Sequence, residues 1–189
     1  MKQAQVLSDI EFKRVVALVR DGKNRMRNEV ALCLSFWVGL RVCEIAALKI
    51  SDVYEKNGKI KEVVNLNASQ TKGDKSRQIV LNEKMQKLLR VYWLQAQVFS
   101  YGGPLIPSQK SSKHFSANSL CQLFWRIFKS AGFSNASSHS GRRTFITKLA
   151  NASVNPKVIM ALAGHKNLST TQRYIEVNQN QLTKAANLI

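Results

Sequence analysis

Residues 31–44 read ALCLSFWVGLRVCE, an apolar run that ends at a glycine and is followed by an arginine and a glutamate. An apolar run of this length is typical of a helix that lies inside a core. We therefore expect a central, buried helix over about residues 26–38, a break at Gly39 and a short helix after Arg41. On that short helix Glu44 can approach the Arg41 guanidinium, because residues three apart share one helix face.

Helical spacing of apolar residues continues on both sides of this segment. Residues 8–11 (SDIE) form a capping box, in which Ser8 accepts from the Glu11 amide and Glu11 reaches back. Apolar residues follow at helical spacing, which predicts a helix over about 9–21. Further repeats of the same kind predict helices over about 85–96, 120–128, 139–151, 156–163 and 168–177.

Residues 60–81 have a different pattern. Three short segments, at 63–64, 69–71 and 78–81, are rich in β-branched residues, and Gly73-Asp74 favours a turn. We expect three antiparallel strands with Lys72 at a hairpin tip. The whole pattern predicts a mainly α protein with a small antiparallel three-stranded sheet, an α+β fold that forms one domain over residues 1–189 with terminal tails at 1–7 and 179–189.

The charge balance predicts the class of partner. Lys and Arg total 29 and Asp and Glu total 11, which gives a net charge of +18. A surface this basic attracts polyanions, and nucleic acid is the default partner, although ribosomal and membrane-surface proteins share this composition. The three cysteines have neither disulfide nor zinc-ligand spacing. No signal peptide or membrane-length apolar run is visible, so we expect a cytoplasmic, nucleoid-associated protein.

Three short segments contain side chains suited to phosphate chemistry: Gly39–Glu44, Ser138–Arg143 and Gly164–Tyr174. Alone, the first segment is more typical of a surface ion pair, and the second is commonly a basic helix start. The third is far more often a tyrosine that packs on a helix. Together with the hairpin lysine they provide cations for nonbridging oxygens, an acid, a base and a nucleophile. That combination suits phosphoryl transfer on DNA.

Six of these side chains, taken in chain order, resemble the catalytic signature of the tyrosine recombinases, the phage integrase family: Arg41, Lys72, His139, Arg142, His165 and Tyr174. The segment 71–75 is similar to the family's hairpin lysine, 170–174 to its nucleophile region, and 8–11 to the start of its catalytic domain. The resemblance extends over about residues 7–178. It implies the family's catalytic-domain fold and a site-specific DNA recombinase that integrates, excises or inverts DNA without a metal, a cofactor or ATP.

The resemblance also implies a role for each matched side chain. Tyr174 would attack the scissile phosphate and form a 3′-phosphotyrosyl link. Arg41 and Arg142 would hold the nonbridging oxygens, and Lys72 would protonate the leaving 5′-oxygen, with Lys75 as the alternative acid.

The remaining matches concern proton transfer and DNA contact. His139 would be the base or hydrogen-bond partner beside the tyrosine, His165 would assist at the phosphate, and Glu44 would orient its basic neighbours. Contacts with the DNA backbone are expected from five further residues: Lys75, Arg77, Arg143, Lys166 and Arg173.

The chain departs from the family pattern in three places. Gly141 stands where the family commonly has Leu, Arg143 stands where many members have His, and only about seven residues precede the catalytic region. We therefore expect either a naturally single-domain recombinase or a fragment without the N-terminal clamp.

The expected partners follow from the reaction. They are double-stranded DNA, further copies of this chain in a homotetramer on paired DNA sites, and possible accessory DNA-binding proteins, with no membrane. The C-terminal tail is a candidate protomer contact, and packing on its own protomer is the alternative. The competing hypotheses are a DNA-binding regulator that does not cleave and an enzyme similar to type IB topoisomerases.

Overall fold

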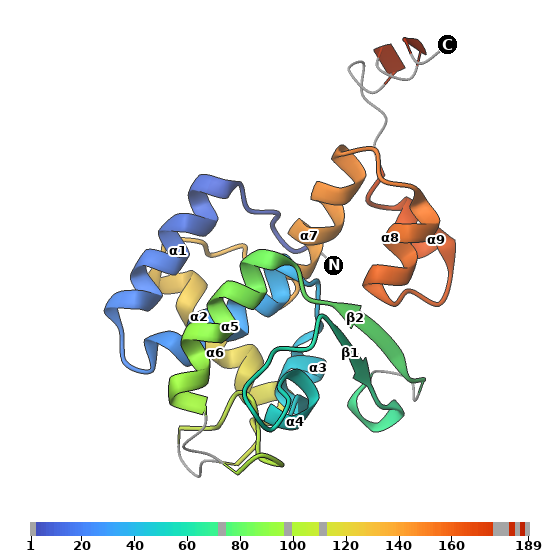
Figure 1. Ribbon diagram of the computed structural model, residues 1–189. Helices are drawn as coiled ribbons and strands as arrows, with labels where there is room; N and C mark the ends of the chain where they lie inside the picture. The colour runs from blue at the N-terminus through green and yellow to red at the C-terminus, as the bar shows by residue number, and fades with distance from the viewer. Residues whose placement is uncertain are drawn as a thin grey trace.

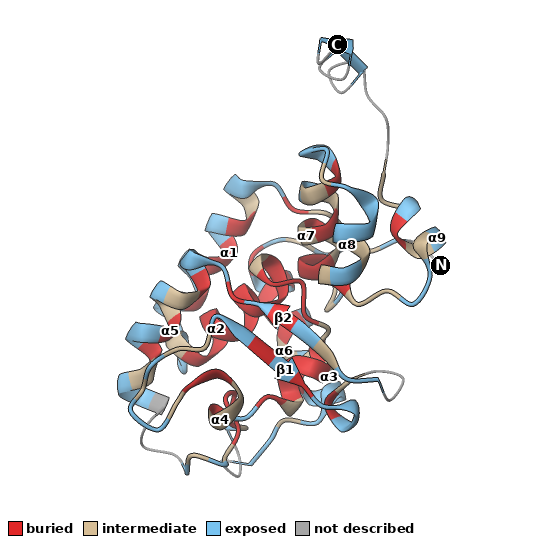
Figure 2. Ribbon diagram, turned by 45° about the vertical axis from the view of Figure 1, so that its right-hand side comes forward, coloured by how far each residue is buried: buried red, intermediate tan, exposed pale blue. Residues whose placement is uncertain are grey.

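The central helix of the fold is α2 (Arg25–Trp37), as the apolar run predicts. The computed structural model describes residues 3–71, 75–96, 100–109, 113–175, 182–183 and 186–187. Residues 27–36 are buried without interruption, and α1 (Asp9–Asp21), α5 (Glu83–Ala96) and α7 (Ser140–Asn151) pack around them. Figure 2 shows the buried residues gathered on α2 and on the inner faces of the helices around it.

The capping box that predicts the first helix is present. Ser8 Oγ accepts from the Glu11 amide at 3.3 Å, and the Ser8 amide donates to Glu11 Oε2 at 2.7 Å. The residues before this cap are also anchored, because the buried Leu7 donates its amide to Thr144 Oγ1 at 3.0 Å. The N-terminal segment therefore lies against α7, close to the start of that helix.

Within the described residues the sheet has two strands, and not the predicted three. Strands β1 (Val63–Leu66) and β2 (Arg77–Val80) pair antiparallel, but the expected middle strand is the 3₁₀ helix η1 (Ala68–Gln70). Gln70 explains the difference, because its side chain accepts from the Asn67 amide and donates to Ala47 O and to Asp52 Oδ2. These bonds hold the side-chain amide of Gln70 in a buried position. Lys72, predicted at the hairpin tip, lies outside the described residues.

The predicted short helix after Gly39 is confirmed as α3 (Val42–Ala47), and α4 (Ile50–Val53) and α6 (Ala117–Ser130) complete this side of the fold. Helices α8 (Pro156–Ala163) and α9 (Leu168–Gln172) lie with α7 beside the sheet (Figure 1). Helix α9 ends earlier than the predicted 168–177, and most of the C-terminal tail lies outside the described residues.

A second, smaller core joins α7 to α8. It consists of the buried residues Ile146, Ala150, Ile159 and Ala163, with Tyr174 and other half-buried apolar side chains packed against them. This cluster fixes the end of α8 and the segment after α9 relative to the start of α7. Within the described part of the chain, no helix combines the length and the apolar character needed to span a bilayer.

The close contact between α2 and α7 gives the first prediction. A Cβ at Gly141 would lie 2.5 Å from Ser35 Oγ and 2.6 Å from Phe36 Cδ2, and both neighbours are buried in α2. We expect Gly141→Ala to reduce the free energy of unfolding by about 1–3 kcal/mol, because overpacking outweighs the better helix propensity of alanine. Urea unfolding measures this loss.

Gly102→Ala is the matched control, since its Cβ would meet no atom within 4 Å. Its effect should stay within about 0.5 kcal/mol. An alanine at 141 that leaves stability unchanged would show that the two helices separate without cost. The same packing has no room for the larger Leu that the resembled family commonly has at this position.

Candidate active site

The carboxyl end of α8 accepts hydrogen bonds from three arginines of three different segments. Arg77 Nη1 donates to Leu162 O at 3.1 Å, Arg142 Nη2 donates to Ala163 O, and Arg41 Nη2 donates to Gly164 O at 3.1 Å. The last carbonyls of a helix have no partner within the helix, and they carry its negative dipole end. Gly164, with φ of 63°, turns the chain out of α8. Each guanidinium is therefore held by a backbone group that a helix end leaves free.

Glu44 is fully buried and links two of these arginines. Its carboxylate accepts from Arg41 Nη1 at 3.0 Å and from Arg77 Nε and Nη2 at 3.1 and 2.8 Å. It also accepts from the Arg41 amide at 2.7 Å, as a capping residue of α3. Burial would raise the pKa of Glu44, but the hydrogen bonds and charges of Arg77 and Arg41 hold it below its usual value. The carboxylate is therefore ionised at neutral pH.

Arg142 is the most buried of the three guanidinium groups, with 7% of the residue exposed. It projects from the first turn of α7, and its Nη1 donates to Gly39 O at 2.7 Å, at the break that the sequence predicts after α2. Burial and the positive charge of Arg41 lower the pKa of Arg142 to about 9. The side chain remains charged at neutral pH, and this charge lacks a carboxylate partner among the described residues.

His165 directly follows the end of α8 and is half-buried. Its Nδ1 lies 2.8 Å from Thr171 Oγ1, and Thr171 is fully buried. Burial, together with the positive charges of Arg142, Arg41 and Arg77, lowers the pKa of His165 to about 4. The imidazole is therefore neutral at pH 7, and Nε2 remains for a ligand.

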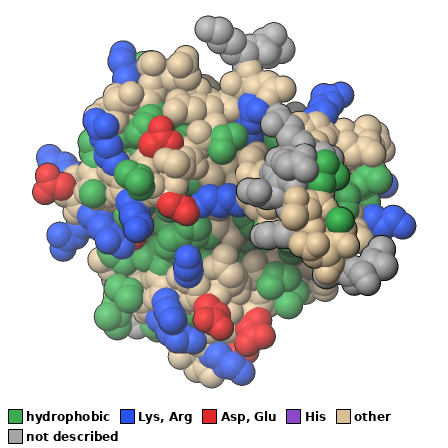
Figure 3. Space-filling view, turned by 90° about the horizontal axis from the view of Figure 1, so that it is seen from above, with side chains coloured by type: hydrophobic (Ala, Val, Ile, Leu, Met, Phe, Trp, Pro, Cys, Tyr) green, Lys and Arg blue, Asp and Glu red, His purple; other side chains and the backbone are tan. Residues whose placement is uncertain are grey.

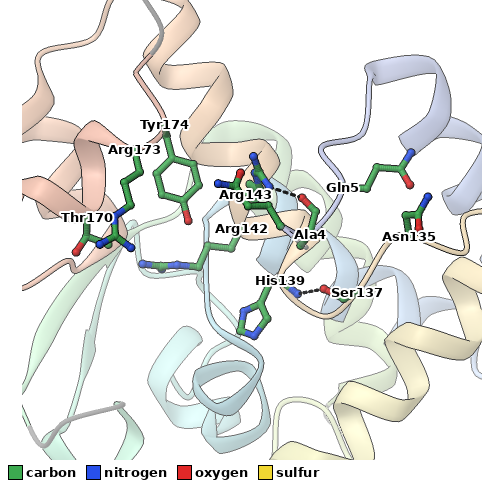
Figure 4. Close-up of a pocket in the computed structure, with 11 residues that line it drawn as sticks. Ala4, Gln5, Asn135, Ser137, His139, Arg142, Arg143, Thr170, Arg173 and Tyr174 are labelled. Atoms are coloured by element: carbon green, nitrogen blue, oxygen red, sulfur yellow. Dashed lines mark hydrogen bonds between the residues drawn. The ribbon is translucent and has the colours of Figure 1, made fainter. Parts of the chain in front are cut away.

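Tyr174 lies beside His165 at the edge of a cavity. The two rings are nearly parallel, with centroids 6.1 Å apart, and the Tyr174 amide donates to Thr171 O at 3.0 Å. Figure 4 shows the Tyr174 hydroxyl pointing into the cavity toward the Arg142 side chain. The cavity has a volume of about 730 Å³, and Arg142, Arg143, Thr170 and Arg173 also line it.

His139 lines the same cavity but from another side. It is exposed at the N-cap of α7, and its amide donates to Ser137 Oγ at 3.3 Å. In the view of Figure 4 the Arg142 side chain runs between the His139 and Tyr174 rings. The structure thus brings Arg41, Arg142, His165 and Tyr174 to one site, with His139 at its rim.

The residues expected to contact DNA fall into two groups. Lys75, Lys166 and Arg173 are exposed. Arg143 is half-buried, and its Nη1 donates to Ala4 O at 2.8 Å, so it holds the N-terminal segment. The Arg77 side chain is only 12% exposed and lies inside the site instead of on the outer surface of the sheet.

Two parts of this site were missed by the motif reasoning. Thr171, the partner of His165, lies in the segment matched for the tyrosine but was given no role. The carbonyls at the end of α8 have no side-chain signature, and their only sequence signal is Gly164 after an apolar helix. In the described part of the chain, no group of three or more His, Cys, Asp or Glu side chains could hold a metal ion.

The chain carries many more basic than acidic side chains. On the face drawn in Figure 3, Lys and Arg side chains are scattered among uncharged ones, with fewer acidic side chains between them. With the overall charge of +18, this distribution favours long-range attraction of a polyanion.

The low pKa of His165 gives a direct prediction. We expect the imidazole resonances of His165 to titrate with a midpoint near 4, well below the ordinary 6.5. The unfolded chain then binds more protons between these two values, so His165 should make the free energy of unfolding fall as pH is lowered from about 6.5 to 4. NMR titration measures the midpoint, and a His165→Gln variant assigns the signal among the three histidines. A midpoint above 6 would contradict the electrostatic description of the site.

Comparison with known proteins gives the family. The model of the phage integrase family matches residues 5–181. Tyrosine recombinase XerC of Lactobacillus delbrueckii subsp. bulgaricus is 29% identical over 182 residues, which covers 92% of this chain and 58% of that protein. The chain thus spans little more than half the length of this curated relative.

Two solved structures have the same fold as this chain. The crystal structure of XerA recombinase matches with a TM-score of 0.77 at 23% identity, over 100% of this chain and 66% of that one. The Tn1549 transposon integrase, solved in complex with transposon right end DNA, matches with a TM-score of 0.78 at 16% identity, over 100% and 67%. The mainly α fold with its small antiparallel sheet is therefore the catalytic-domain fold of tyrosine recombinases, and the chain belongs to the phage integrase family.

Proposed function

We propose that this chain is the catalytic region of a site-specific DNA recombinase that cuts and rejoins DNA through a 3′-phosphotyrosine intermediate. The observation that carries the proposal is the convergence of Arg41, Arg142, His165 and Tyr174 around the end of α8, where Arg142 and Tyr174 line one cavity. Because their segments lie far apart in the chain, a purely structural explanation would have to account for each of them separately.

The arginines are suited to hold a phosphodiester. A guanidinium has five N–H donors, and Arg41 and Arg142 each use two side-chain donors in the bonds described above. Their remaining donors are available for the two nonbridging oxygens, and their geometry is already fixed by Glu44 and the end of α8. Such a site stabilises the charge that builds up in the transition state without having to reorganise.

The proposed cleavage step needs no metal, because side chains of the protein accept and donate the protons. The Tyr174 oxygen forms a bond to phosphorus while the bond from phosphorus to the 5′-oxygen breaks. The tyrosine proton leaves to a base, for which His139 at the cavity rim is the candidate, and a lysine of the hairpin gives its proton to the 5′-oxygen. Attack of a 5′-hydroxyl from a second duplex reverses the step, so no ATP is needed.

The neutral state of His165 defines its proposed part. An uncharged imidazole held by Thr171 through Nδ1 presents Nε2, which donates a hydrogen bond to a nonbridging oxygen when it carries the proton. Lys75, Lys166 and Arg173 are proposed to contact the DNA backbone, because they are exposed and basic. Exchange of strands between two duplexes favours a homotetramer, for which the tail at 179–189 is the candidate protomer contact.

The first test asks whether the tyrosine becomes esterified. A pool of nicked duplexes with randomised sequence is incubated with the protein in EDTA, and SDS-resistant complexes are isolated and sequenced. We expect a covalent adduct on a subset of sequences, and Tyr174→Phe should abolish it while leaving DNA binding intact, since only the nucleophile is removed. Binding without any adduct would leave a DNA-binding regulator, and relaxation of any plasmid would indicate a topoisomerase.

A second test identifies the general acid among the hairpin lysines. A substrate with sulfur in place of the bridging 5′-oxygen has a leaving group that needs no proton. We expect Lys72→Ala to slow cleavage of the ordinary substrate at least about 100-fold and to regain speed on the sulfur substrate. Lys75→Ala is the matched control. Its cleavage rate relative to the wild type should be the same on the ordinary and on the sulfur substrate. The opposite pattern would assign the acid to Lys75, and no rescue of either variant would exclude both.

A further inference from the structure

Arg77 links its own strand to two segments that are far apart in the chain. It is the first residue of β2, its Nε and Nη2 form two parallel bonds to Glu44, and its Nη1 donates to Leu162 O. Its stem lies against the end of α8, because a Cβ at Gly164 would come within 2.6 Å of Arg77 Cδ. One side chain therefore joins the hairpin, the start of α3 and the end of α8.

These contacts fix the groups proposed to act on the phosphate. Glu44 also holds Arg41, and Leu162 lies three residues before His165. Arg77 is the second residue after Lys75 in the sequence, at the start of the strand that follows the candidate acids. A displacement of Arg77 would thus shift Arg41, His165 and the hairpin relative to one another.

We propose that Arg77 is a positioning residue of the site, and not a contact with the DNA backbone; this inference rests on the proposed function. Its donors face protein acceptors, and its side chain is 12% exposed, so it presents little to a phosphate outside. Lysine cannot replace it. An ammonium is a point charge without the planar fork that bridges a carboxylate and a carbonyl at the same time.

The chain offers a matched control for the cost of breaking such a pair. Arg20 makes the same two parallel bonds to the buried Glu29, with Nε at 2.9 Å and Nη2 at 2.6 Å. This pair lies between α1 and α2 and shares no residue with the site. Arg20→Met and Arg77→Met therefore each remove one arginine from a buried carboxylate, and only the second acts on the site.

The experiment compares Arg77→Met, Arg77→Lys and Arg20→Met by DNA affinity, its salt dependence and the single-turnover rate of adduct formation at saturating DNA. We expect both Arg77 variants to lose about 100-fold in rate, the effect of a displacement of roughly 1 Å in an active site, with little change in affinity or salt slope. Arg20→Met should retain the rate. Loss of affinity with a shallower salt slope and an unchanged rate would make Arg77 a phosphate contact and overturn the proposal.

A measurement on the protein without DNA keeps this inference separate from the proposed function. The His165 titration midpoint should rise in Arg77→Met, since a nearby positive charge is lost, and it should stay unchanged in Arg20→Met. If the wild-type protein forms no adduct, the recombinase proposal fails, and the midpoints still test whether the Arg77 charge acts on His165 as the structure places it. Equal midpoints in the two variants, or a wild-type rate in Arg77→Lys, would overturn the positioning role.

Discussion

The site depends on the electrostatics of one helix end. Three guanidinium groups repel one another, and Arg142 is largely withdrawn from water. They remain together because the last carbonyls of α8 and the buried carboxylate of Glu44 lie between them. Removing one partner of such an arrangement leaves buried charge uncompensated, which typically costs about 3–5 kcal/mol. The position of α8 relative to α3, α7 and β2 is therefore the constraint from which the rest of the site follows.

The hydrophobic cores supply the rigidity that this arrangement needs. Helix α2 is buried over ten successive residues, and α7 approaches it closely because Gly141 has no side chain. Arg142 follows Gly141 directly, so the closeness of the two helices also sets how deeply its guanidinium lies. The second core then fixes α8 and the segment of Tyr174 to α7. Apolar packing thus sets the backbone positions, and the arginines select the arrangement of α8 that satisfies their donors.

Most helices could be predicted from the sequence, because apolar periodicity, the Ser8 capping box and the Gly39 break are local signals. The errors have long-range causes. The segment at 69–71 has strand-like composition, but Gln70 forms hydrogen bonds with residues about twenty positions earlier, which no local pattern contains. The burial of Arg77 could not be predicted either, since an arginine's partners are invisible in the sequence. Motif order led us to expect Arg41, Arg142, His165 and Tyr174 in one site, and these four do lie together. The carbonyls that orient the arginines have no sequence signature.

The same electrostatics would respond to a bound phosphodiester. The three arginines give the site an excess of positive charge, and this excess is one reason why His165 is neutral. A bound phosphodiester would bring negative charge next to the same arginines and thereby weaken the repulsion that disfavours a proton on His165. Under the proposed function, the charge state of His165 would thus depend on whether a phosphodiester is bound. Because Glu44 and the end of α8 fix the arginines in advance, this coupling requires no large movement of the protein, only the arrival of the anion.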